Sequence, residues 1–317
     1  MHKKLLDHFK GHLHVLNRSP ATINAYVQHT QLFLKAADVT NIKQVTTAII
    51  ESWIKDLYDY RTAQDRPYST ATICAKIRSI KRFFEFLEKS NTIFIDPAEF
   101  ITEPKINKTK IKPTLTEHEA KQILDQPNLG TLTGIRDRTM IEVFYATGIR
   151  INELCSLTIY DTDVQSSTLR INKGKGYKDR VVPLGRHAVK FIKEYISKVR
   201  PKLAVKNKTI RYLFIGQDSK PLGKQTVGLM IRTYARKTKI EKRVTAHTFR
   251  HTFATLLVKN GAQIVAVQKM LGHENLRTTQ GYIRSLIPDI KKEHQKTHPR
   301  EKDQERITKP KAIRKGR

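Results

Sequence analysis

The sequence has few of the features that mark secreted, membrane-spanning or zinc-stabilised proteins. Only Cys74 and Cys155 are cysteines, too few for a disulfide framework or a cysteine-built zinc site, and this favours a reducing compartment. No run of about 18 apolar residues is present, so a membrane span is not expected. Asp7 interrupts the N-terminal residues before any apolar stretch forms, which disfavours a secretory signal. We therefore expect a cytoplasmic protein that has no membrane partner.

Acidic residues are also scarce. The 317 residues include 60 Lys and Arg against 29 Asp and Glu, which gives a formal charge of +31. A charge of this size favours a polyanionic partner, and nucleic acid is the natural one, because phosphate contacts by Lys and Arg release condensed counterions. An anionic membrane would attract the same charge, but the sequence has no lipidation signal. A merely soluble basic protein is the remaining alternative on charge alone.

Helical periodicity dominates the first hundred residues. Helices are predicted to begin at Ser19-Pro20, near Ile49 and at Ser69, and each carries an apolar stripe that we assign to a core. The stripes are Ile23, Tyr26, Val27, Leu32, Phe33 and Leu34; then Ile49, Ile50, Trp53, Ile54 and Leu57; then Ile73, Ile77, Ile80, Phe83, Phe84 and Leu87. The opposite side of the third helix carries Lys76, Arg78, Lys81 and Arg82. This basic face is predicted to lie along a DNA backbone.

A basic segment separates this region from the rest of the chain. Residues 104–113 contain four lysines, no acid and a proline at each end, a composition typical of an exposed linker between domains. About two domains are also what the length predicts. We expect a helical domain over residues 1–103, a linker over 104–113, a second domain over 114–300 and a basic tail over 301–317.

The second region mixes helices with a short hairpin. Thr116 followed by Glu119 is the pattern of a capped helix start, and helical periodicity continues to Gly148. Residues 169–172 and 180–184 are predicted strands of a β-hairpin, with Gly174-Lys175-Gly176 at its tip, and helices resume from about residue 185. The expected fold class is mainly α with a small antiparallel β-sheet (α+β).

Several residues able to bind a phosphate occur in separated segments. They are Arg150 in Ala146–Leu154, Lys175 at the hairpin tip, His247 and Arg250 in His247–His251, His273 after Leu271-Gly272, and Tyr282. His247 and Arg250 are three residues apart, so on a helix they share one face. Arginine offers planar, permanently charged donors that match phosphate oxygens, and histidine can exchange a proton near neutral pH. The set could converge on one phosphate.

The order and spacing of these segments resemble the tyrosine recombinase (phage integrase) family, whose pattern is Arg…Lys…His-x-x-Arg…His…Tyr. Thr279–Tyr282 and Ile290–Arg300 resemble the end of Xer-type recombinases, and residues 1–103 resemble their core-binding domain more loosely. The chain departs from the Xer pattern after the tyrosine, where Ile283-Arg284 replaces the common Thr-His. The resemblance implies a two-domain DNA clamp, with a helical core-binding (SAM-like) domain and a catalytic domain that ends in an exchanged segment.

The resemblance also implies a role for each motif residue. Tyr282 would be the nucleophile that forms a 3′-phosphotyrosine with DNA, and Arg150 and Arg250 would clamp the nonbridging phosphate oxygens. Lys175 would protonate the leaving 5′-oxygen, with Lys173 and Lys178 as nearby alternatives. His247 would donate to the phosphate or transfer a proton, and His273 would donate a hydrogen bond to the phosphate. Glu153 would orient Arg150 rather than react, His251 is expected to be structural, and no cofactor or metal is implied.

As an expectation, the protein is a site-specific recombinase that acts as a homo-tetramer, or paired with a related recombinase, on two duplex DNA sites with inverted-repeat cores. Strand exchange would pass through a Holliday junction. Its task would be dimer or cointegrate resolution, or integration and excision of a mobile element. Two alternatives stay open: a DNA-binding protein without catalysis, although every motif position is occupied, and a type IB topoisomerase, against which the Xer-like end argues.

Overall fold

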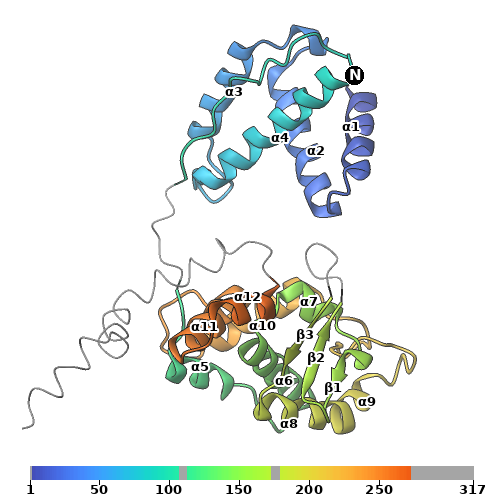
Figure 1. Cartoon of the computed structure of the whole chain (residues 1–317), viewed down its shortest axis with the longest axis vertical. Helices are drawn as coiled ribbons and strands as arrows, with labels where there is room; N and C mark the ends of the chain where they lie inside the picture. The colour runs from blue at the N-terminus through green and yellow to red at the C-terminus, as the bar shows by residue number, and fades with distance from the viewer. Residues whose placement is uncertain (1, 107–112, 173–178, 273–317) are drawn as a thin grey trace, which may run out of the picture. The chain divides into compact units, whose positions relative to one another are not determined.

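The computed structural model describes residues 2–106, 113–172 and 179–272 (Figure 1). The chain divides into two compact units, Met1–Lys110 and Ile111–Arg317. The division falls inside the segment 104–113, for which the sequence predicts a linker. The linker itself and the domain limits at 103, 114 and 300 stay predictions. Within the described residues, no helix is both long enough and apolar enough to cross a membrane.

The described part of the first unit is helical. Its elements are α1 (Lys3–Val15), α2 (Pro20–Ala37), the 3-10 helix η1 (Ile42–Gln44), α3 (Thr47–Asp59) and α4 (Thr70–Lys89). The predicted helix starts at Ser19 and Ser69 are confirmed, since each hydroxyl accepts a hydrogen bond of 3.2 Å from the backbone N–H three residues later. α1 has no counterpart among the helices predicted from the sequence.

The core of the first unit lies around α4, which contacts α1, α2 and α3 (Figure 1). The apolar stripes predicted for α2, α3 and α4 meet here, and aromatic rings occupy its centre. The Phe33 ring lies 5.1 Å from that of Trp53 and 5.9 Å from that of Phe84, both edge-on. Leu32 is the exception among the predicted core residues, because its side chain is 45% exposed.

The prediction that Lys76 lies on an exposed basic face of α4 is wrong. Lys76 is buried, and its Nζ lies 4.8 Å from the centroid of the Tyr68 ring. Burial lowers the pKa of this ammonium group. The long aliphatic stem of lysine packs like an apolar side chain, and an aromatic face can accept its charge, so helical spacing alone does not separate this lysine from its exposed neighbours.

The other three basic side chains of that face have partners inside the same unit. Arg78 pairs with Glu103, Arg82 pairs with Glu85, and Lys81 donates to the carbonyl oxygens of Glu99 and Ile101. The side chains of Arg78 and Arg82 are nevertheless 53% and 38% exposed. The face therefore keeps accessible positive charge, but its side chains are held by local contacts.

The described part of the second unit combines helices with one three-stranded sheet. Its elements are α5 (Glu117–Leu124), α6 (Leu132–Thr147), α7 (Ile151–Ser156), η2 (Ile159–Asp161), β1 (Thr162–Asp163), β2 (Thr168–Ile171), β3 (Arg180–Pro183), α8 (Arg186–Glu194), the π-helix η3 (Tyr195–Val199), α9 (Arg200–Leu203), α10 (Lys224–Arg236), α11 (Ala246–Lys259) and α12 (Ile264–Leu271). The capping box predicted at Thr116 and Glu119 is confirmed.

The sheet is antiparallel in the order β1-β2-β3. Leu169 pairs with Val182 and Ile171 with Arg180, so the predicted hairpin strands are confirmed, while its tip at 173–178 lies outside the described residues. α6 is the central helix of this unit and contacts α5, α8, α11 and β3. α12 contacts both α11 and β3, and it therefore joins the helical part of the unit to the sheet (Figure 1). The predicted fold class, mainly α with a small antiparallel sheet, is confirmed.

The first unit offers a direct test of its core. Replacing the fully buried Phe84 with Ala should lower the free energy of unfolding by about 3 to 5 kcal/mol, because the change removes apolar contacts and leaves a cavity. Phe94 is 95% exposed, and Phe94→Ala is the matched control, with an expected change within about 0.5 kcal/mol.

Urea unfolding followed by tryptophan fluorescence measures both variants. The chain has one tryptophan, Trp53, and it packs in the same core as Phe84, so its emission reports on the first unit alone. Equal unfolding midpoints for Phe84→Ala and Phe94→Ala would contradict the assignment of this core.

Candidate active site

Three successive carbonyl groups at the C-terminal end of α12 each accept a hydrogen bond from a different arginine. The pairs are Met270 with Arg180 Nε at 2.8 Å, Leu271 with Arg250 Nη2 at 2.6 Å, and Gly272 with Arg150 Nη2 at 3.3 Å. The last carbonyls of a helix have no partner within it and carry the negative end of its dipole, so guanidinium groups satisfy them well. This helix end is therefore the point at which the two motif arginines meet.

Arg250 lies on α11 and is 4% exposed, which makes it one of the most deeply buried charges among the described residues. Its Nη1 donates to the carbonyl oxygen of Gly148 at 2.7 Å, and Gly148 caps the end of α6. The guanidinium thus bridges the C-terminal ends of two helices, α6 and α12. Their partial negative charges offset part of the cost of burying a cation.

Gly148 determines how the chain passes from α6 to Arg150. Its φ of +60° lies in the left-handed region, and a Cβ there would approach within 2.5 Å of Cδ1 of Phe253. Only glycine fits both constraints. The turn ends α6 where the sequence predicts, and it makes Arg150 the N-cap of the next helix, α7.

Glu153 holds Arg150 by two contacts, as the spacing of three residues predicts. Its Oε1 accepts from Arg150 Nη1 at 2.7 Å, and its Oε2 accepts from the backbone N–H of Arg150 at 2.8 Å. The same carboxylate takes two bonds from Arg180, at 3.1 Å to Oε1 and 2.8 Å to Oε2. Burial alone would raise the pKa of Glu153, but the bonds and charges of Arg180 and Arg150 outweigh it and lower the pKa.

The histidines of α11 have different surroundings. His247 lies in the first turn of the helix and is exposed, whereas Arg250, three residues later, is buried, and His251 is half-buried. Thr245 starts α11, and its hydroxyl accepts from the N–H of Thr248 at 3.2 Å. His247 is thus the more exposed of the two rings, and the roles expected for His247 and His251 stay predictions.

The structure thus brings Arg150 and Arg250 together and places His247 on the same helix as Arg250. Lys175, His273 and Tyr282 lie outside the described residues. His273 directly follows Gly272, the residue that caps α12. In the sequence it is therefore the residue next to the helix end at which the arginines converge. Within the described ranges, no cluster of His, Cys, Asp and Glu side chains could hold a metal ion.

Comparison with known proteins identifies the family of this chain. Residues 113–287 match the model of the phage integrase family, and residues 6–91 match that of the phage integrase N-terminal SAM-like domain. The chain is 35% identical over 285 residues to tyrosine recombinase XerD of Staphylococcus saprophyticus, covering 89% of this chain and 94% of the relative. XerD of Staphylococcus aureus is 34% identical over the same share of each chain.

This chain belongs to the phage integrase family. Within that family it is a Xer-like tyrosine site-specific recombinase.

Solved structures of phage integrase family members share the fold. The crystal structure of XerA recombinase is 28% identical, with 94% of this chain and 99% of that chain covered and a TM-score of 0.53. XerH bound to its difH substrate has a TM-score of 0.65 at 24% identity, over 84% and 76% of the two chains. A lambda integrase dimer bound to a COC′ core site has a TM-score of 0.68 at 17% identity, over 88% and 94%. The last two comparisons support the fold alone.

Arg180 is the residue of this site that the family pattern and the sequence reasoning did not identify. Arg180 is a strand residue in the middle of a basic segment, so its residue type alone does not distinguish it from an ordinary surface arginine. The sequence feature that could have identified Arg180 is the strand period of two. It places Arg180 on the same face as Val182, a buried residue. An arginine on the buried face of a strand needs an acidic or carbonyl partner, and here it has both.

The lowered pKa of Glu153 predicts an acid-dependent loss of stability. Near neutral pH, Glu153→Gln should cost about 3 kcal/mol of unfolding free energy, because two largely buried guanidinium groups lose their carboxylate. The folded pKa lies below the ordinary 4.5, so the contribution of the carboxylate is complete above that value and is lost as the pH falls through the folded pKa. The difference between wild type and variant should therefore shrink below about pH 4.5.

Urea unfolding followed by circular dichroism over a series of pH values measures this difference. Glu241→Gln, which changes an exposed carboxylate in the same unit, is the control and should alter stability little at any pH. A Glu153→Gln deficit that stayed constant down to pH 3 would contradict the ion-pair explanation.

Proposed function

We propose that this recombinase cuts and rejoins duplex DNA at specific sites through a covalent 3′-phosphotyrosine bond at Tyr282. The observation that carries the proposal is the convergence of Arg150 and Arg250 on the end of α12, directly before His273, in a chain of this family. Both guanidinium groups are held by buried or half-buried partners. Such preorganised donors stabilise developing negative charge better than solvent-exposed ones do.

In the proposed reaction, the phenol oxygen of Tyr282 attacks the phosphorus and forms a P–O bond, while the bond to the 5′-oxygen breaks. Arg150 and Arg250 stabilise the charge on the nonbridging oxygens, and Lys175 gives a proton to the leaving 5′-oxygen. His247 donates to the phosphate or moves a proton, and His273 donates a hydrogen bond to the phosphate. The phosphotyrosine keeps the bond energy for the reverse attack by a 5′-hydroxyl, so the cycle needs no external energy source.

The wider proposal concerns partners. XerH and lambda integrase, which share the fold, were solved with DNA sites, and the net charge of +31 suits a phosphate backbone. We propose that duplex DNA with an inverted-repeat core site is the substrate and that the first unit is the core-binding domain. The working species would be a cytoplasmic homo-tetramer, or a pairing with a related recombinase, that resolves dimers or cointegrates or moves a mobile element through a Holliday junction.

The nucleophile is tested by Tyr282→Phe, which removes only the hydroxyl. The variant should bind a core site with unchanged affinity and form no covalent complex, because the attacking oxygen is gone. A nicked suicide substrate, analysed on a denaturing gel, measures covalent complex formation. Tyr160→Phe, at a tyrosine that is 68% exposed, is the matched control and should react like wild type. An adduct that persists in Tyr282→Phe would assign the nucleophile to another residue. In a separate assay of the wild-type protein, plasmid relaxation without exchange between two sites would favour a topoisomerase.

The general acid is tested by Lys175→Ala together with a modified substrate. Cleavage of ordinary DNA should slow by about 10²- to 10⁴-fold, the usual value of a positioned proton donor. A 5′-phosphorothiolate at the scissile bond should restore the rate, because sulfur leaves without a proton. Lys173→Ala and Lys178→Ala are the matched controls and should cleave ordinary DNA normally. Rescue of Lys173→Ala or Lys178→Ala in place of Lys175→Ala would move the acid to that lysine.

A further inference from the structure

Arg180 contacts two other parts of the candidate active site through one side chain. It is the first residue of β3, and its side chain is 11% exposed. Nε donates to the Met270 carbonyl at the end of α12, while Nη1 and Nη2 donate to the two oxygens of Glu153 on α7. A guanidinium presents its donors in a planar fork, which allows this combination of a bidentate carboxylate and a carbonyl, whereas an ammonium could not span both.

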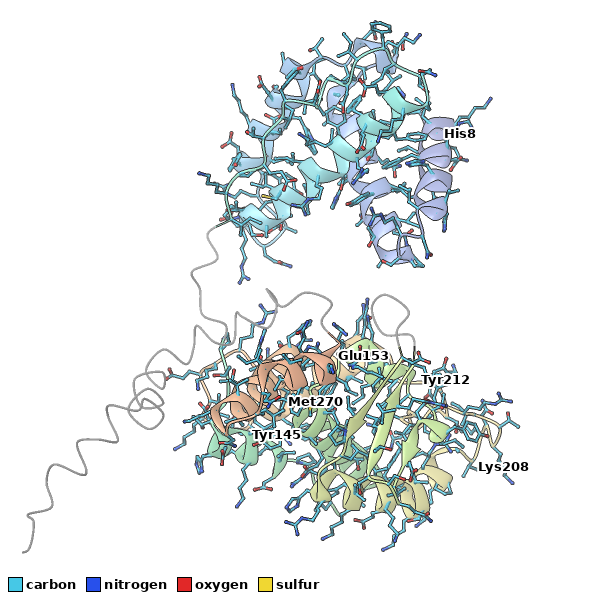
Figure 2. The ribbon with its side chains drawn as sticks, viewed as in Figure 1. His8, Tyr145, Glu153, Lys208, Tyr212 and Met270 are labelled. Carbon is cyan, nitrogen blue, oxygen red and sulfur yellow. The ribbon has the colours of Figure 1, made fainter. Side chains whose placement is uncertain are left out.

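The contacts of Arg180 and Arg150 form a closed ring. Glu153 binds both arginines, Arg180 continues to the Met270 carbonyl, and Arg150 continues to the Gly272 carbonyl two residues later. Figure 2 labels Glu153 and Met270, which Arg180 contacts, in the second unit. In a closed ring, each link restricts the others, so the orientation of Arg150 depends on Arg180 even though the two side chains share only a carboxylate and a helix end.

The turn after α12 is shaped around Arg180. Gly272 has a φ of +62°, and a Cβ at that position would lie 3.1 Å from Nη1 and 3.2 Å from Cζ of Arg180. The guanidinium therefore packs against the backbone of the residue that directly precedes His273. At its other end, Arg180 follows closely on the segment 173–178, which contains Lys175, so the same residue borders the chain positions of two further motif residues.

We propose that Arg180 is a positioning residue for DNA cleavage: it holds the Glu153 carboxylate, and through it the Arg150 guanidinium, against the end of α12. The proposal rests on the function proposed above for Arg150. Arg180 touches no reacting atom in this scheme. It acts by fixing the angle at which the donors of Arg150 face the phosphate, and misplacement of such a donor by about 1 Å can cost about 10²-fold in rate.

The test compares Arg180→Lys with wild type in single-turnover cleavage of a suicide substrate at saturating DNA, with DNA affinity measured separately. Lysine keeps the charge but cannot bridge the carboxylate and the carbonyl, so cleavage should slow by about 10²-fold while affinity changes little. Arg170→Lys is the matched control. Arg170 lies on the adjacent strand β2 and has a carboxylate partner, Asp161 at 3.6 Å, but it contacts neither Glu153 nor α12 in the interactions described. Cleavage by Arg170→Lys should equal that of wild type.

A second comparison separates positioning from general stability. In an Arg150→Lys background, the guanidinium that Arg180 positions is already gone, so adding Arg180→Lys should slow cleavage by less than about threefold. If Arg180 acted independently of Arg150, the rate losses of the two single variants would instead multiply in the double variant. If Arg180→Lys does not fold, Gly272→Ala replaces it, since the added Cβ presses on the guanidinium from the helix end. Gly272→Ala is then expected to slow cleavage without loss of DNA affinity.

The outcomes differ for the two proposals. Wild-type cleavage rates in folded Arg180→Lys, or in Gly272→Ala if that variant is used, would overturn the role of Arg180, as would fully multiplicative effects with Arg150→Lys. Those results would leave the proposed function intact, because wild type still forms its adduct. Absence of any covalent complex with wild-type protein, or its persistence in Tyr282→Phe, would instead overturn the proposed function.

Discussion

The second unit depends on how it accommodates the buried charge of Arg250. The guanidinium lies between the C-terminal ends of α6 and α12 and donates to the carbonyl oxygens of Gly148 and Leu271 at 2.7 and 2.6 Å. Both helices must end at this point for those carbonyls to be available, and Gly148 and Gly272, each in the left-handed region, are the residues that end them. The buried guanidinium and the two helix ends therefore depend on each other, and the end of α6 starts the turn to Arg150.

The acceptors differ between the two motif arginines, and the difference has a chemical consequence. Arg250 is held by backbone carbonyls, which orient a guanidinium without cancelling its net charge. Arg150 is held by the carboxylate of Glu153, but Arg180 shares that carboxylate, so one negative charge serves two positive ones. The arrangement fixes the donors while leaving a net positive charge in the region. A phosphoryl transition state, which develops negative charge, would need this electrostatic condition.

The sequence allowed the fold class, the helix starts at Ser19, Ser69 and Thr116, and the pairing of Glu153 with Arg150 to be predicted, because each follows from local spacing or capping chemistry. The carbonyl acceptors of Arg250 could not be predicted, since Gly148 lies 102 residues away and Leu271 lies 21 residues away along the chain. Lys76 was misassigned for a related reason: its burial depends on Tyr68, whose ring it covers. Helical period identifies a face, but only tertiary packing determines whether a long basic side chain on it reaches water.

The end of α12 also connects the described part of the site to the residues that follow it. Three arginines from α11, β3 and the start of α7 fix successive carbonyls there, so the position of Gly272 is set by contacts from three separate elements. His273 is the next residue, and Tyr282 follows nine residues later. A segment of that length has a limited reach, about 3.3 to 3.6 Å per residue when extended. The arginines therefore hold the described starting point of the chain segment that leads to the proposed nucleophile.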